Sequence, residues 1–304
     1  MAAPCMAERA GSLSEALARL GLFVLWLLSH APLPWLAILG RSLGRLLYLL
    51  HRSRRRVVMT NIALCFPELS GLAQRRLARA HFAALGQGLF DLTVAWWASA
   101  ERLRRLVSFR GREHYDKAVA EGPVILLVPH FVALEVGVVL SIERPMANVY
   151  RELPNPVFEQ AFRAATGRFG ATLITQDQGV RPVLKALREG RVLYYLPDQD
   201  FGERSSVFAP FFGVPTITLH AVGRLARAAH AQVVPCYVWQ RPAGRGYEIA
   251  FGPALSGFPS GDVQIDARAT NRAIEDGVRE HPEQYFWVHK RFKTRPPGAP
   301  SVYS

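Results

Sequence analysis

The fold of this chain is most constrained by short apolar runs that alternate with helix-like segments after about Val107. The runs "PVILLV" (123–128), "MANVYRE" (146–152), "ATLITQ" (171–176) and "RVLYYL" (191–196) are each followed by a helical pattern. Near-continuous apolar strands are typical of a sheet that is covered on both faces. The alternation therefore predicts an α/β fold with a mixed, mostly parallel sheet flanked by helices.

The segments around this sheet carry local predictions of their own. A helix is expected from just after His130 to about Leu140, and another over residues 216–230. The stretch "FAPFFGVP" (Phe208–Pro215), with its two prolines, is expected to be a loop.

Composition and charge narrow the class of partner. The chain has 304 residues, half of them apolar, and a formal net charge of +13, so it can bury a sizeable core and favours an anionic partner. That partner could be a nucleic acid, a membrane surface, or an acidic protein or substrate. The basic residues are scattered, and no nucleic-acid-binding motif is present, so no nucleic acid is expected.

Cysteine usage argues against a structural metal or a disulfide framework. Cys5, Cys65 and Cys236 stand far apart, without a CxxC pair or a Cys/His cluster. We therefore expect no metal site.

The N-terminal region predicts an attachment to a membrane. No formally charged residue occurs from Leu20 to Leu39, and a basic stretch follows between Arg41 and Arg56. Twenty such residues suffice for a membrane-spanning helix, but Pro32 and Pro34 interrupt the run. We interpret residues 1–56 as a helical membrane-anchoring region and 57–304 as a separate domain that contains the predicted sheet. Spanning and interfacial anchors both remain open, as does a buried helical hairpin of a soluble protein.

A histidine and an acid follow the most apolar predicted strand. His130 and Glu135 are separated by "FVAL", and within one regular helix their side chains would point about 140° apart. They can meet if His130 precedes the helix on a strand-to-helix turn. Glu135 would then accept a hydrogen bond from one imidazole nitrogen and leave the other free as a general base. No serine or cysteine nucleophile stands beside them, so the base would activate a substrate hydroxyl. The spacing alone is a weak signal, since a buried structural histidine fits it too.

Polar residues also gather at the ends of the other predicted strands, where α/β folds place functional groups. Arg151 and Asn155 follow one strand, and Asp198 and Asp200 follow another. Arg291 stands in the basic-aromatic stretch "WVHKRFK" near the C-terminus.

Several strings together resemble one family. "HFVALE", "YRELPNP", "LPDQDFG", "FAPFFGVP", "EQYFWVHKRFKTRP" and "NIALCFPELS" are similar to the late acyltransferases of lipid A biosynthesis, the lauroyl/myristoyl type. That family belongs to the larger lysophospholipid acyltransferase superfamily, which shares an HxxxxD/E motif. The resemblance covers most of the chain and is weakest over residues 1–20.

The resemblance implies an HxxxxD/E-type acyltransferase that moves a lauroyl or myristoyl chain. The donor would be acyl carrier protein and the acceptor a hydroxyl of a phosphorylated lipid A precursor, at the cytoplasmic face of the inner membrane. His130 would be the base and Glu135 its orienting acid, with no metal or cofactor. The remaining candidates would bind substrate or stabilise an oxyanion (Arg151, Asn155, Asp198, Asp200, Arg291) or line an acyl channel (Phe208, Phe211, Phe212). The alternatives are another lipid acyltransferase of the superfamily and a membrane-associated hydrolase.

Overall fold

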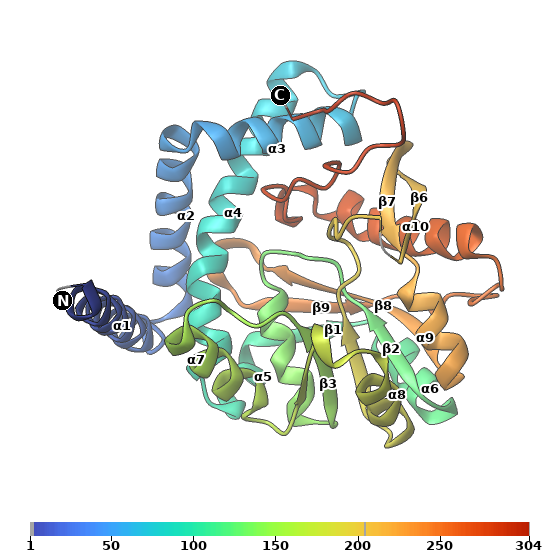
Figure 1. Cartoon of the computed structure of the whole chain (residues 1–304), viewed down its shortest axis with the longest axis horizontal. Coiled ribbons are helices and arrows are strands. Elements are labelled where there is room, and N and C mark those ends of the chain that lie inside the picture. Colours follow the sequence, from blue (N-terminus) through green and yellow to red (C-terminus); the bar gives the residue numbers. More distant parts are fainter. Residues whose placement is uncertain (1–2, 204, 304) are drawn as a thin grey trace.

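The architecture is that of an α/β domain with a helical N-terminal region (Figure 1). The structure, a computed structural model, describes residues 3–203 and 205–303, with side chains from Ser14 onward. The helices are α1 (Ala3–Leu28), α2 (Leu33–Leu50), α3 (Arg52–Cys65), α4 (Gly71–Trp97), α5 (Ala100–Leu106), α6 (Arg112–Glu121), α7 (Pro156–Gly167), α8 (Val180–Arg188), α9 (Ala221–Ala229) and α10 (Val263–Glu280). Short 3-10 helices are η1 (Leu134–Ile142), η2 (Gln176–Gln178), η3 (Pro242–Gly244) and η4 (Pro282–Gln284).

Seven strands form the central sheet in the order β1-β9-β8-β2-β5-β3-β4. They are β1 (Val107–Arg110), β2 (Val124–Leu127), β3 (Met146–Tyr150), β4 (Thr172–Thr175), β5 (Val192–Tyr195), β8 (Gln232–Gln240) and β9 (Tyr247–Phe251). Only the β8–β9 pair is antiparallel; the other neighbours run parallel. The prediction of a mixed, mostly parallel sheet flanked by helices is confirmed.

The sheet is buried on both faces because alternate strand residues pack against different helices. Leu126 and Tyr194 lie in a core with residues of η1 and α7, whereas Ile125 and Leu193 pack with residues of α8 and α9. All four residues of β2 are buried. This two-sided burial explains the unbroken apolar runs seen in the sequence.

Three local predictions need correction. Residues 216–219 of the expected helix belong to β7 (Val214–Leu219), and the helix begins only at Ala221. The expected loop at 208–215 is the tip of a hairpin made by β6 (Ser206–Phe211) and β7, which turns at Phe212 and Gly213, both with positive φ. The helix after His130 is a 3-10 helix that starts at Leu134.

The N-terminal helices break where the prolines predict. α1 ends at Leu28, and Pro32 precedes the first residue of α2. α2 then lies along α4 in close backbone contact: a Cβ at Gly44 would stand 1.9 Å from the carbonyl oxygen of Phe82. The glycine is therefore required by this helix–helix approach.

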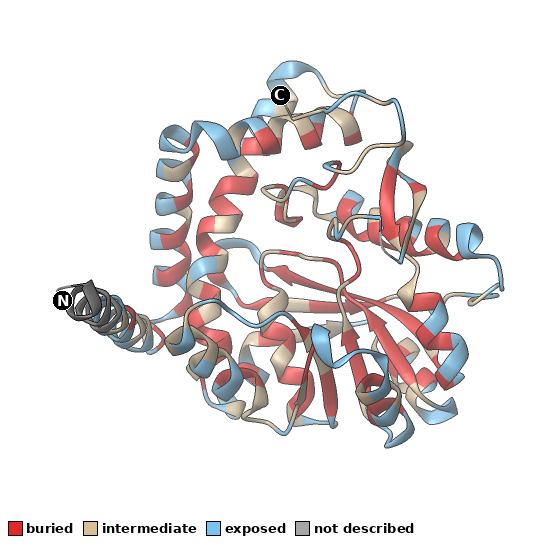
Figure 2. Ribbon diagram, viewed as in Figure 1, coloured by how far each residue is buried: buried red, intermediate tan, exposed pale blue. Residues whose placement is uncertain are grey.

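The outward surface of α1 and α2 is apolar. Large exposed hydrophobic residues cover it, while the inner face of α2 is buried (Figure 2). They are Leu17, Leu20, Phe23, Val24, Trp26 and Leu27 on α1, and Trp35, Ile38, Leu39, Leu43, Leu46, Leu49 and Leu50 on α2. Among the described residues, α2 alone is long and apolar enough to cross a membrane, but the buried helix of a soluble protein can meet the same criteria.

Candidate active site

His130 and Asp198 meet because their strands are parallel neighbours. Leu127 at the end of β2 is in register with Tyr195 at the end of β5, and each polar residue follows three positions later. The carboxyl ends of parallel strands therefore bring the two side chains to one edge of the sheet. Nδ1 of His130 lies 2.5 Å from Oδ1 of Asp198, and the backbone N–H of His130 donates to Oδ2 at 2.9 Å.

The ionisation of Asp198 fixes the tautomer of this histidine. Burial alone raises the pKa of the Asp198 carboxyl, but the charge and hydrogen bonds of His130, with the charge of Arg291, lower it to about 2. Asp198 is therefore a carboxylate that can only accept, so Nδ1 carries the proton. Nε2 is then an acceptor, and no described group forms a hydrogen bond with it.

The backbone around His130 is held by the segment that follows α10. Phe286 N–H donates to the carbonyl oxygen of His130, and Val132 N–H donates to that of Gln284, each at 2.9 Å. Phe131 and Tyr285 form an antiparallel bridge between these two contacts. The histidine thus sits on a backbone clamped to a second chain segment.

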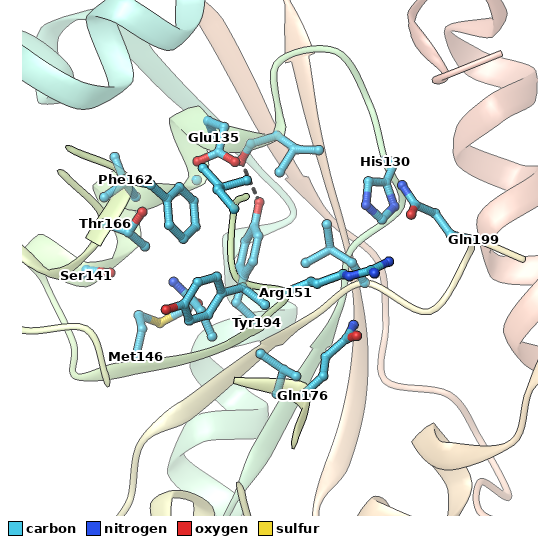
Figure 3. Close-up of a pocket in the computed structure, with 18 of the residues that line it drawn as sticks. His130, Glu135, Ser141, Met146, Arg151, Phe162, Thr166, Gln176, Tyr194 and Gln199 are labelled. Carbon is cyan, nitrogen blue, oxygen red and sulfur yellow. Dashed lines mark hydrogen bonds between the residues drawn. The ribbon is translucent and has the colours of Figure 1, made fainter. Parts of the chain in front are cut away.

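Glu135 lines the same cavity as His130, but it is not the hydrogen-bond partner of the imidazole. The cavity measures about 430 Å³ and lies beside η1 (Figure 3). Burial raises the pKa of Glu135 to about 7, although the nearby charge of His130 works in the opposite direction. The expectation that Glu135 orients the imidazole through a hydrogen bond is corrected, because Asp198 takes that position.

The cavity wall near Glu135 is shaped by a tyrosine and a glycine. Tyr194, on β5, donates a hydrogen bond from its hydroxyl to the carbonyl oxygen of Leu134 at 2.8 Å (Figure 3). A Cβ at Gly137 would lie only 2.3 Å from that hydroxyl oxygen, so glycine is needed for the close approach.

The remaining lining is mostly apolar, with polar groups at defined positions. Met146, Phe162 and Leu196 contribute apolar surface. Arg151 and Gln199 add a guanidinium and an amide, and Arg151 extends toward the side where His130 lies (Figure 3). Such a site suits a hydrocarbon chain whose polar end reaches His130.

Two substrate-binding candidates form hydrogen bonds within the protein. The side chain of Asn155 caps α7, accepting hydrogen bonds from the backbone N–H groups of Val157 and Phe158. Arg291 is buried and donates to the carbonyl oxygen of Ile217 at 2.7 Å. Neither lines the 430 Å³ cavity, but Arg291 lines a smaller pocket together with His130 and Asp198, and its charge helps to lower the pKa of Asp198.

Asp200 likewise binds protein groups. Its carboxylate accepts from the backbone and hydroxyl of Thr294 and from the backbone of Gly202. Its backbone N–H donates to Nε2 of His289, a neutral imidazole because burial lowers its pKa to about 4. These bonds join the loop after β5 to the C-terminal segment. That no metal takes part remains a prediction.

The three phenylalanines predicted to line an acyl channel lie in the β6–β7 hairpin. Phe211 is fully buried in an aromatic core with Tyr285 and Phe292. Phe212 packs on Phe66, and neither it nor Phe208 lines the cavity with His130. Core packing accounts for Phe211 and Phe212.

Sequence reasoning missed Tyr194 and Gln284. Tyr194 was visible only as one residue of an apolar strand, and Gln284 stands in a stretch with no local signal for a contact with residue 132. Both act through pairings between distant segments.

The sequence of the chain matches one protein family over most of its length. The profile of the bacterial lipid A biosynthesis acyltransferases matches residues 6–294. A lipid A biosynthesis lauroyltransferase of Escherichia coli K12 is 36% identical over 288 residues, which cover 93% of this chain and 94% of the relative. The palmitoleoyltransferase of the same strain is 31% identical, covering 93% of both chains. Its myristoyltransferase is 33% identical, covering 89% of this chain and 83% of the relative. The chain belongs to the bacterial lipid A biosynthesis acyltransferase family.

Proposed function

We propose that the protein transfers a fatty acyl chain, lauroyl or myristoyl, from acyl carrier protein to a hydroxyl of a phosphorylated lipid A precursor. The observation that carries this proposal is the free Nε2 of His130 beside an apolar cavity, in a chain of this family. The cavity accepts the donor's hydrocarbon chain with its thioester near His130.

His130 acts as the general base in this reaction. Nε2 removes the proton of the acceptor hydroxyl while the oxygen attacks the thioester carbonyl carbon. The C–S bond then breaks, the imidazolium returns the proton to the departing sulfur, and the products are a new ester and the free carrier thiol. No covalent bond to the protein forms.

The two acids have separate roles. Asp198 holds the proton on Nδ1 and stabilises the imidazolium, as the acid does in a catalytic triad. Glu135, when ionised, adds negative charge on the cavity side of the same ring. Arg151 is the candidate that stabilises the oxyanion or binds a substrate phosphate.

The reaction takes place at the cytoplasmic face of the inner membrane. The exposed apolar surface of α1 and α2 supports attachment to a bilayer, through either a spanning or an interfacial helix. The net charge of +13 favours the acidic carrier protein, the phosphorylated acceptor and the anionic leaflet.

The test is acyl transfer by the purified full chain in detergent. Acyl carrier protein that bears a lauroyl or a myristoyl chain is supplied with a phosphorylated lipid A precursor. The masses of the products are determined by mass spectrometry. The expected product is the acceptor plus one acyl chain. Release of free fatty acid with an unchanged acceptor indicates a hydrolase, and transfer only to a lysophospholipid offered in parallel indicates a different acceptor class. Either result overturns the proposal.

A further inference from the structure

A second cavity lies on the opposite face of the sheet. It measures about 680 Å³, within the range of small-molecule sites, and lies between α8 and α9. Its walls include Val183, Leu184 and Leu225. Because consecutive strand residues face opposite ways, Tyr194 lines the first cavity and Tyr195 the second.

The two cavities meet at the edge of the sheet that carries His130. Val149, Gln176, Leu196 and Phe201 line both of them. These residues stand at or just after the carboxyl ends of β3, β4 and β5. An amphiphile with more than one chain can therefore reach both cavities from one entrance.

Cationic groups border the second cavity. Arg224 lines it and also lines an adjoining hollow that contains Arg227. Both side chains are exposed, and neither forms a hydrogen bond or ion pair with a described residue. The acid in the same hollow, Asp266, already accepts two hydrogen bonds from Ser260. The guanidinium groups are thus available to an anionic group.

We infer that the second cavity binds one hydrocarbon chain of the acceptor lipid, with a phosphate of that lipid near Arg224. The inference rests on the proposed function, which needs sites for two apolar substrates. The donor's thioester must reach His130, so its chain fits the first cavity, beside the reacting atoms. The acceptor combines several chains with phosphates, and the second site combines an apolar wall with unpaired cations.

Narrowing the second cavity tests this assignment by kinetics. Val180 lines it at the start of α8 and is half exposed, so Val180→Trp adds bulk without disturbing the core. We expect KM for the phosphorylated acceptor to rise about tenfold, with KM for lauroyl-carrier protein and kcat within twofold of wild type. Ile265→Trp, at an equally exposed position outside the cavity, is the control and should change neither constant.

Arg224→Gln tests whether a phosphate of the acceptor lipid binds near Arg224. It should raise KM for the phosphorylated acceptor severalfold and leave KM for a dephosphorylated acceptor unchanged. A rise in donor KM in Val180→Trp, or no change in acceptor KM in either variant, overturns the inference.

Direct binding separates this inference from the proposed reaction. A phosphorylated acceptor with a diazirine at the end of its acyl chains is photolysed with the wild-type chain, without donor. Cross-links at residues 180–184 or 219–225 support the second site, and cross-links confined to residues 134–166 overturn it. Failure of the wild type to transfer an acyl chain would refute the proposed function. The cross-linking needs no transfer, so it would still show whether the acceptor occupies the second cavity.

Discussion

The imidazole of His130 is paired with Asp198, across 2.5 Å between Nδ1 and Oδ1, rather than with the acid five positions along the chain. The pair joins two parallel strands that are adjacent in the sheet but 68 residues apart in the sequence. This arrangement makes Asp198 the residue that sets the tautomer of the base.

Asp198→Asn should therefore lower the acyl-transfer rate by roughly 10²- to 10⁴-fold, because an amide can donate to Nδ1 and place the proton on Nε2. Steady-state kcat of the purified variant checks this. Asp200→Asn is the matched control: its carboxylate binds Thr294, so transfer should fall less than about fivefold. Equal losses of rate in the two variants would contradict the prediction that Asp198 sets the tautomer of His130.

The raised pKa of Glu135 predicts a pH-dependent stability. Its pKa is about 7 in the fold against 4.5 for an ordinary glutamate, so the folded chain keeps a proton that the unfolded chain loses between these values. The contribution of Glu135 to stability thus falls as pH rises from about 4.5 to 7. Glu135→Gln should gain Tm relative to wild type between pH 5 and pH 8. A Tm difference that stays constant with pH would contradict this.

Ionised Glu135 should also support catalysis. The wild-type kcat should rise with pH through about 7 more steeply than that of Glu135→Gln, whose rate should be lower by about tenfold. The pH profiles of the two proteins, recorded at saturating substrates, make the comparison. Superimposable profiles would mean that the charge of Glu135 plays no part.

Gly137→Ala should distort the cavity, since the new Cβ would meet the Tyr194 hydroxyl at 2.3 Å. We expect a loss of about 1–3 kcal/mol in unfolding free energy and a higher KM for the acyl donor. Gly167→Ala, which adds its methyl group to open space, should have neither effect. Chemical denaturation of the three proteins measures the stability, and steady-state kinetics measures KM for the donor. Wild-type values of both in Gly137→Ala would contradict this.

The exposed face of α2 should govern membrane attachment. Leu39→Glu combined with Leu46→Glu places two charges on that face, where both leucines are about half exposed. Partitioning into anionic vesicles should fall by on the order of tenfold or more, with transfer to detergent-solubilised acceptor retained. Ile265→Glu, on α10, serves as the control. Vesicle sedimentation with unchanged binding of the double variant would exclude this face as the anchor.

Local patterns in the sequence predicted the layers of the fold, because apolar strand runs and helical periodicity are set by burial on each element. The same reasoning placed His130 and Glu135 at one strand-to-helix turn, and both line one cavity. It misread residues 216–219 as helix, because the alternating "TITL" preceded an amphipathic helix without a break.

The partner of His130 was not accessible in this way. It depends on the pairing of β2 with β5, and no local pattern specifies which strands become neighbours. For Asn155 and Asp200, likewise, the sequence did not reveal which groups their side chains contact. Both are polar residues at strand ends, but a helix cap engages one and a distant threonine the other.

The central claim is that His130 removes the proton from the acceptor hydroxyl, and the single-turnover rate of acyl transfer by His130→Ala tests it most directly. The variant should bind vesicles and melt like the wild type, while its rate of ester formation from lauroyl-carrier protein falls by about 10³-fold or more. A folded His130→Ala protein with a single-turnover rate within a few fold of wild type would contradict the mechanism.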